Sequence, residues 1–205
     1  MKSRPFRFAI VTLGLMSGTV LLGGCASEPK PAPPKTTRSE TVKEGVPGGV
    51  IVDTVTLTAR VDAVNPETRK VTLVESNGKK TTITAGPEVV NFNQIRVGDE
   101  LKATLQSELV VFMKERGAPS NDGQITAIAG APKGAKPGIA MADSVEVTAT
   151  VSAIDQAAHR ATLRFPDGHS LTIPVRPDVD LKKVSLGDQV VIRNTDAVAV
   201  VVETP

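Results

Sequence analysis

Hydrophobic and polar residues alternate with a period of two along much of the chain. From Val55 to Ala63 every second residue is apolar and the residues between are polar, and the same alternation runs from Val145 to Ala153. Because side chains on a β-strand point alternately to its two faces, this pattern predicts strands that bury one face.

Further strands and turns are predicted around these two. Asn77-Gly78 and Asp167-Gly168 each lie between two short alternating runs, and both dipeptides accept the positive φ values of a tight hairpin turn. The runs that flank these turns are 71–75 and 81–85, and 161–165 and 171–175; fourth and fifth strands are predicted at 101–105 and 109–113, and at 189–193 and 198–202.

The two halves of the chain are copies of one pattern, related by adding 90 to a residue number from Pro47 onward. Thr58-Ala59 recurs as Thr148-Ala149 and Gly78 recurs as Gly168. After a one-residue deletion, Gly98-Asp99 recurs as Gly187-Asp188. Turn residues and interior positions recur together, so we expect two copies of one fold.

We therefore expect an all-β protein with two tandem small five-stranded barrels, over residues 47–116 and 137–205. Short strands with one irregular connection after the third are similar to an oligonucleotide- and oligosaccharide-binding (OB) barrel, and an SH3-like barrel is the alternative. Residues 117–136 contain several Gly and Pro residues and are predicted to be a linker, in which 124–129 could form a short edge strand.

Residues 1–24 follow a different pattern. Three basic residues precede an apolar run at 8–22, which is typical of a secretory signal and shorter than the roughly 20 residues of a membrane-spanning helix. The single cysteine, Cys25, directly follows Leu22-Gly23-Gly24. This arrangement resembles the lipobox of bacterial lipoproteins.

The resemblance implies cleavage before Cys25, a diacylglycerol thioether on its sulfur and acylation of the new N-terminus, so that the membrane is a partner through this anchor. Residues 25–46, with several prolines, are then expected to be a disordered tether. Ala26 follows the cysteine where lipoproteins of the inner membrane typically carry Asp. The resemblance thus favours the outer membrane, with the protein facing the periplasm.

Three interior runs are similar to those of tandem-repeat bacterial lipoproteins of uncharacterised function. They are Gly86–Phe92, Val97–Asp99 and Ala131–Gly138. This likeness implies a cell-envelope location and a barrel fold, and it implies no activity.

Loss of residues 1–24 changes the charge of the chain. The whole chain has 24 basic and 22 acidic residues, and three of the basic residues and none of the acidic ones precede Cys25, which leaves 21 against 22. Nucleic-acid binding needs a clustered basic face and usually aromatic side chains for stacking. After residue 24 the aromatic residues are Phe92, Phe112 and Phe165, so we expect no nucleic-acid partner.

The sequence contains few candidate residues for catalysis or metal binding. His159 and His169 lie in the second copy, too far apart along one hairpin to share a metal, and Asp178 and Asp180 are expected on a solvated loop. A likeness to small periplasmic copper chaperones does not extend to their histidine, methionine and tryptophan ligands, since Trp is absent and Met113 and Met141 lie apart in the sequence. We expect no catalytic, cofactor or metal site.

The side chains of Phe92 and Phe165 are predicted to be interior, with Phe92 plugging a barrel end. The function that best fits these observations is a membrane-anchored, non-catalytic envelope module that contacts an envelope protein through loops or strand edges. A carrier of a small ligand or metal ion is the alternative, and a hydrolase is a third and weaker candidate.

Overall fold

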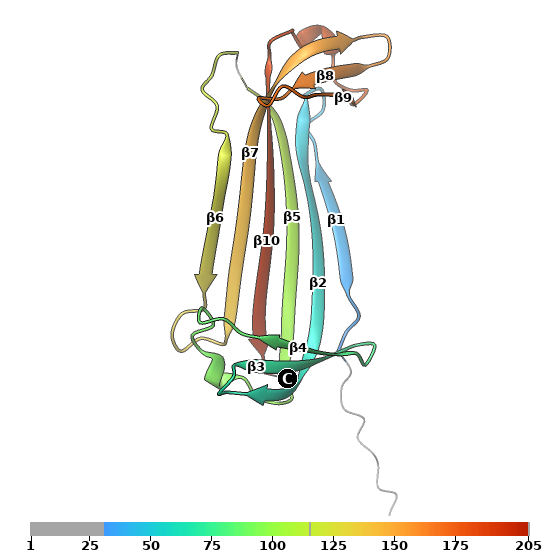
Figure 1. The fold of residues 1–205 in the computed structure, drawn as a ribbon. Coiled ribbons are helices and arrows are strands. Elements are labelled where there is room, and N and C mark those ends of the chain that lie inside the picture. The colour runs from blue at the N-terminus through green and yellow to red at the C-terminus, as the bar shows by residue number, and fades with distance from the viewer. Residues whose placement is uncertain (1–30, 115, 205) are drawn as a thin grey trace, which may run out of the picture.

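The computed structural model describes residues 31–114 and 116–204, and it is all-β, as the alternation predicts (Figure 1). The strands are β1 (Lys35–Thr41), β2 (Gly48–Asn65), β3 (Lys70–Glu75), β4 (Lys80–Thr84), β5 (Glu100–Lys114), β6 (Gly123–Gly130), β7 (Gly138–Asp155), β8 (Arg160–Arg164), β9 (Ser170–Pro174) and β10 (Gln189–Glu203). Single 3-10 turns occur at η1 (Phe92–Gln94) and η2 (Leu181–Lys183). In these residues no helix is long and apolar enough to cross a membrane. The predicted signal, Leu22–Gly24 and Cys25 lie outside the described residues.

The ten strands form one antiparallel sheet, so the prediction of two closed five-stranded barrels is wrong. Strands β1, β2, β5, β10, β7 and β6 lie side by side as a central sheet, and the β3–β4 and β8–β9 hairpins lie at its opposite ends (Figure 1). Both hairpins turn where predicted, with Gly78 at φ 88° and Gly168 at φ 91°.

The barrels are replaced by an open sheet because the predicted fourth and fifth strands of each copy are continuous. The runs 101–105 and 109–113 are both part of β5, and 189–193 and 198–202 are both part of β10. The intervening Gln106-Ser107-Glu108 contains neither glycine nor proline to reverse the chain. Strand β5 therefore runs straight for 15 residues, about 50 Å at about 3.4 Å per residue, and pairs with β10 along its whole length.

The two copies are related by an approximate two-fold axis through the middle of this β5–β10 pair. Asp99 and Asp188 are equivalent and differ by 89 in number, as do Ser107 and Asp196, which face each other in the ladder. The axis passes between these two residues. The register of β2 on β3, including a bulge after Val61, recurs in β7 on β8 after Val151.

The outermost strands of the central sheet, β1 and β6, are also equivalent. Arg38 in β1 pairs with Asp53, and Thr126 in β6 pairs with the equivalent Asp143. Strand β6 confirms the edge strand predicted within 124–129. Strand β1 corrects the disordered tether over part of its length, because Lys35–Thr41 is hydrogen-bonded along β2. We therefore take the first copy as residues 35–114 and the second as 123–203.

Each end of the sheet holds a hydrophobic core that both copies complete. The first core consists of Ala59, Val61, Val71, Leu73, Phe92, Ile95 and Val202, and the second of Ala149, Val151, Leu163 and Val190 with Val111 and Met113 packed against them. Val202 belongs to the second copy and lies in the first core, whereas Val111 and Met113 belong to the first copy and lie against the second. Because β5 and β10 each run straight from one end of the sheet to the other, each strand carries residues of one copy into the core at the other copy's end.

Candidate functional site

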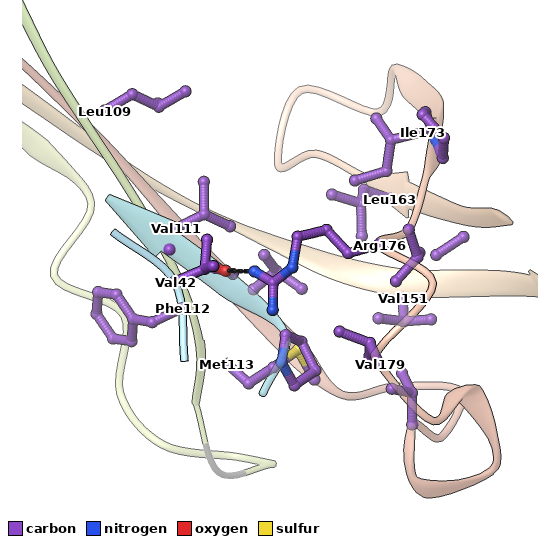
Figure 2. Close-up of a pocket in the computed structure, with 18 of the residues that line it drawn as sticks. Val42, Leu109, Val111, Phe112, Met113, Val151, Leu163, Ile173, Arg176 and Val179 are labelled. Atoms are coloured by element: carbon purple, nitrogen blue, oxygen red, sulfur yellow. Dashed lines mark hydrogen bonds between the residues drawn. The ribbon is translucent and has the colours of Figure 1, made fainter. Parts of the chain in front are cut away.

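The second core borders an apolar cavity of about 320 Å³ (Figure 2). Its walls come from the start of β2, the end of β5, the hairpin β8–β9, and the segment that contains η2. The lining includes Ile51, Leu109, Val111, Met113, Val151, Leu163, Ile173, Val179, Leu181, Val184 and Val190. The charged residues in its lining are Glu40 and Arg176. A cavity of this size with apolar walls and few polar groups is typical of a small-molecule site.

At the first end of the sheet, Phe92 occupies the position equivalent to Leu181 and is buried in the first core. This side chain is only 1% exposed, and the Arg69 guanidinium lies 4.8 Å from the centre of its ring. Arg69 also donates hydrogen bonds to the carbonyl oxygens of Ala85, Gly86 and Val89 at 3.0, 2.6 and 2.9 Å. The first end is therefore closed by an aromatic ring and a long side chain that lies over it.

Smaller residues occupy these positions in the second copy. The turn η2 begins with Leu181 where η1 begins with Phe92, and it is capped by Val184 where η1 is capped by Ile95. His159 stands where the first copy has Arg69, with the same left-handed backbone (φ 52° and 53°). Each replacement shortens a side chain, so the same backbone leaves space at the second end.

Arg176 lies beside the cavity, at the position of Gly86 in the first copy. Its guanidinium donates to the carbonyl oxygens of Lys43 and Val46 at 3.1 and 3.0 Å, and to that of Gly48. These acceptors belong to the first copy, in the loop between β1 and β2 and at the start of β2. Arg176 therefore fastens the β8–β9 side of the cavity to the opposite copy.

The carboxylate of Asp178 completes this contact. It accepts two hydrogen bonds from Arg176, at 3.0 and 2.9 Å, and one from the backbone N–H of Gly45 at 2.8 Å. Hydrogen bonding to Arg176, followed by that to Gly45, holds the pKa of Asp178 well below its usual range. The hydrogen bond to Asp178 raises the pKa of Arg176, and the negative charge of Glu40 adds to this effect. The pair is thus ionised at any pH near neutrality.

Asp178 and Asp180 are exposed on the loop between β9 and η2, as expected, and the hydrogen bonds of Asp178 add a structural role that the sequence did not predict. Asp180 accepts a hydrogen bond from the N–H of Lys182 at 3.0 Å and caps η2. The two carboxylates have different hydrogen-bond partners and do not form a paired acidic site.

The histidines have separate partners. The His159 ring nitrogen Nε2 lies 3.0 Å from the carbonyl oxygen of Arg176, and the His169 ring stacks on Phe165 with 4.2 Å between centroids. Nδ1 of His169 also lies 2.5 Å from the carboxylate of Asp167. Within residues 31–114 and 116–204, no group of three or more His, Cys, Asp or Glu side chains is placed to hold a metal ion.

Predictions for the interior residues are confirmed in part. Phe92 does fill one end of the fold, although no barrel closes there, and Phe165 packs against the second core. Met113 lines the cavity, whereas Met141 is 46% exposed on the central sheet. Sequence reasoning missed Arg176 and Leu181. A comparison of the two copies would have found both residues, because the first copy has Gly86 and Phe92 at the equivalent positions.

No protein-family model matches the chain, and no curated protein is similar to it in sequence.

Proposed function

We propose that the protein is a membrane-anchored, non-catalytic envelope protein that binds a small apolar molecule in the cavity of its second end. The observation that carries this proposal is the difference between two equivalent ends of one fold. Phe92 closes the first end, and the second end keeps a cavity of about 320 Å³ beside Leu181. The fold itself does not require the cavity, because the filled version exists in the same molecule.

The size of the cavity limits its ligand. At about 30 Å³ for each water-sized group, 320 Å³ holds roughly ten non-hydrogen atoms, which corresponds to a short alkyl chain. Each methylene that leaves water contributes about 0.8 kcal/mol, so such a chain gains gross binding free energy of several kcal/mol before the cost of immobilisation.

The charges beside the cavity favour a ligand with an uncharged polar end. Arg176 already donates to four acceptor groups, including the Asp178 carboxylate that neutralises it. Glu40, an exposed residue of the lining, adds a second negative charge near Arg176, whose guanidinium is already paired with the Asp178 carboxylate. A fatty alcohol therefore fits this site better than a fatty acid.

The position of the chain entry supports an outward-facing site. The Thr58 hydroxyl donates to the carbonyl oxygen of Ala32 at 2.9 Å, which places the start of the described chain at the first end of the sheet. Gly48, beside the cavity, lies ten residues further back along β2, about 33 Å from Thr58 at about 3.3 Å per residue. With the anchor expected on Cys25, the first end lies toward the membrane and the cavity faces away from it.

Thermal unfolding with 1-decanol tests this proposal. The chain from Ala26 onward, which contains every described element, is expected to gain stability with increasing 1-decanol and to gain less with decanoate. The variant Leu181→Phe/Val184→Ile, which copies Phe92 and Ile95, is expected to lose this response because its cavity is filled.

Leu186→Phe is the matched control, since Leu186 is 58% exposed and the added ring does not enter the cavity. This control should keep the response of the unmodified chain. Equal stabilisation of the filled variant and the control by 1-decanol would refute the proposed site, and so would a lack of any response in the unmodified chain.

A protein partner in the envelope is the second candidate function. The observation in its favour is that every residue of the edge strands β1 and β6 is exposed, which leaves backbone groups open to a further strand.

A further inference from the structure

The two edges of the central sheet are equivalent in fold but differ in charge. Strand β1 carries Lys35, Arg38 and Glu40, and β6 has Gly123, Thr126 and Ile128 at the equivalent positions. Charged residues on an edge strand discourage pairing with other chains. Strand β6, with the sequence Gly-Gln-Ile-Thr-Ala-Ile-Ala-Gly, contains no charge and no proline. Strand β6 therefore lacks the charged residues that protect β1 from pairing with another chain.

The backbone of β6 is in register to accept another strand. The N–H of Ala131 donates to the carbonyl oxygen of Gly138 at 3.0 Å, in continuation of the β6–β7 ladder. Because backbone groups alternate in direction along a strand, the N–H and C=O groups of Gln124, Thr126, Ile128 and Gly130 point away from β7. These four residues present the open edge.

We propose that a second copy of this chain pairs with this edge, β6 against β6, in antiparallel orientation about a two-fold axis perpendicular to the sheet. In the register centred on Ala127, Thr126 of one copy lies opposite Ile128 of the other, and Gln124 lies opposite Gly130. All four outward residues of each strand are then paired, with about eight backbone hydrogen bonds across the interface. The two central sheets become one.

The charges at the two ends of β6 favour a second copy over an unrelated strand. Asp122 directly precedes β6 and Lys133 follows it closely, and both are exposed. Antiparallel self-pairing in this register places Asp122 opposite Pro132 of the second copy, next to its Lys133. The symmetry forms this complementary contact twice, as is expected of an isologous interface. Ile125 and Ile128, 74% and 56% exposed, also lose part of their contact with water.

Cysteine cross-linking tests the pairing. In this register Ala127 faces Ala127 of the second copy as a non-hydrogen-bonded pair, with Cα atoms about 4.5 Å apart, within the range of a disulfide. The chain from Ala26 onward has no cysteine of its own, so Ala127→Cys introduces a single thiol. Under mild oxidation this variant is expected to form a covalent dimer efficiently at micromolar concentration. Ser39→Cys, at the equivalent position in β1, is the matched control and is expected to stay monomeric.

A second variant places like charges on the open edge. In this register Thr126→Lys/Ile128→Lys sets a lysine of each copy directly opposite a lysine of the other, and in sedimentation velocity it is expected to remain monomeric at concentrations where the unmodified chain is a dimer. Its thermal unfolding at low concentration should match that of the unmodified chain. An unmodified chain that is monomeric throughout, equal cross-linking at positions 127 and 39, or a dimeric charged variant would each overturn the proposal. Binding of 1-decanol is a separate measurement that these variants leave unchanged.

Discussion

Val202→Ala tests whether the two copies complete each other's cores. Val202 lies near the end of the second copy, is 5% exposed, and packs in the first core with Val61 and Val71. The substitution removes two buried carbons, about 1.6 kcal/mol at about 0.8 kcal/mol each. The space left in a packed core adds to this loss, so we expect the free energy of unfolding to fall by about 2–3 kcal/mol.

Urea unfolding followed by circular dichroism measures the loss, with Val201→Ala as the control. Val201 is the preceding residue of the same strand, points to the other face, and is 40% exposed. It is expected to cost less than about 1 kcal/mol, because its side chain already contacts water. Equal losses for the two variants would contradict the packing of Val202 in a core.

Hydrogen exchange locates the effect at one end of the sheet. The Val61 N–H donates to the backbone carbonyl oxygen of Asp99 at 2.8 Å at the first end of the sheet. The equivalent Val151 N–H donates to the backbone carbonyl oxygen of Asp188 at 2.9 Å at the second end. In Val202→Ala we expect the Val61 amide to lose more protection than the Val151 amide. If each copy were an independent domain, this substitution would act on its own copy, and loss confined to Val151 would refute the shared cores.

Three further predictions concern the contacts around the cavity. Gly48→Ala should lower the free energy of unfolding by more than about 2 kcal/mol, because Gly48 has φ 98° and an added Cβ would lie 2.1 Å from the Val111 carbonyl oxygen. The control Gly78→Ala, in an open turn, should lower it by about 1 kcal/mol, and urea unfolding measures both losses. Arg176→Gly, which copies the first repeat, should speed amide exchange in the loop 42–47, as measured by mass spectrometry. The lowered pKa of Asp178 means that its contribution to stability is complete above the unfolded value of about 4 and is lost as the pH falls below it. Asp178→Asn should therefore flatten the fall in stability below pH about 4, as followed by thermal unfolding across pH.

Local patterns in the sequence predicted the strands and turns but not their assembly. Alternation and the Asn77-Gly78 turn depend on neighbours in the chain, and both are confirmed. The joining of 101–105 and 109–113 into one strand is marked locally only by the lack of glycine and proline at 106–108. It also depends on pairing with β2 and with β10, about 90 residues away, and no local pattern encodes those partners. Strand β1 was missed for the same reason. Its polar residues show no alternation, and they are extended because β2 offers them hydrogen bonds.

The cavity was encoded in the differences between the repeats rather than in either repeat alone. Leu181 and Arg176 are ordinary residues on their own, and their meaning comes from Phe92 and Gly86 at the equivalent positions. The open edge is likewise visible only when β6 is compared with β1. A search for motifs of known chemistry misses both features.

Residues of the second copy can be compared with the equivalent residues of the first copy, which lie on a similar backbone. The fold accepts Phe92 with Arg69 at one end, and that solution buries an aromatic ring and satisfies the arginine. A filled core and a charged edge are the more stable and more soluble choices. The second copy departs from both, at Leu181 and at Ile128. The proposed binding at the cavity and the proposed pairing at the edge would each give one of these departures a physical role.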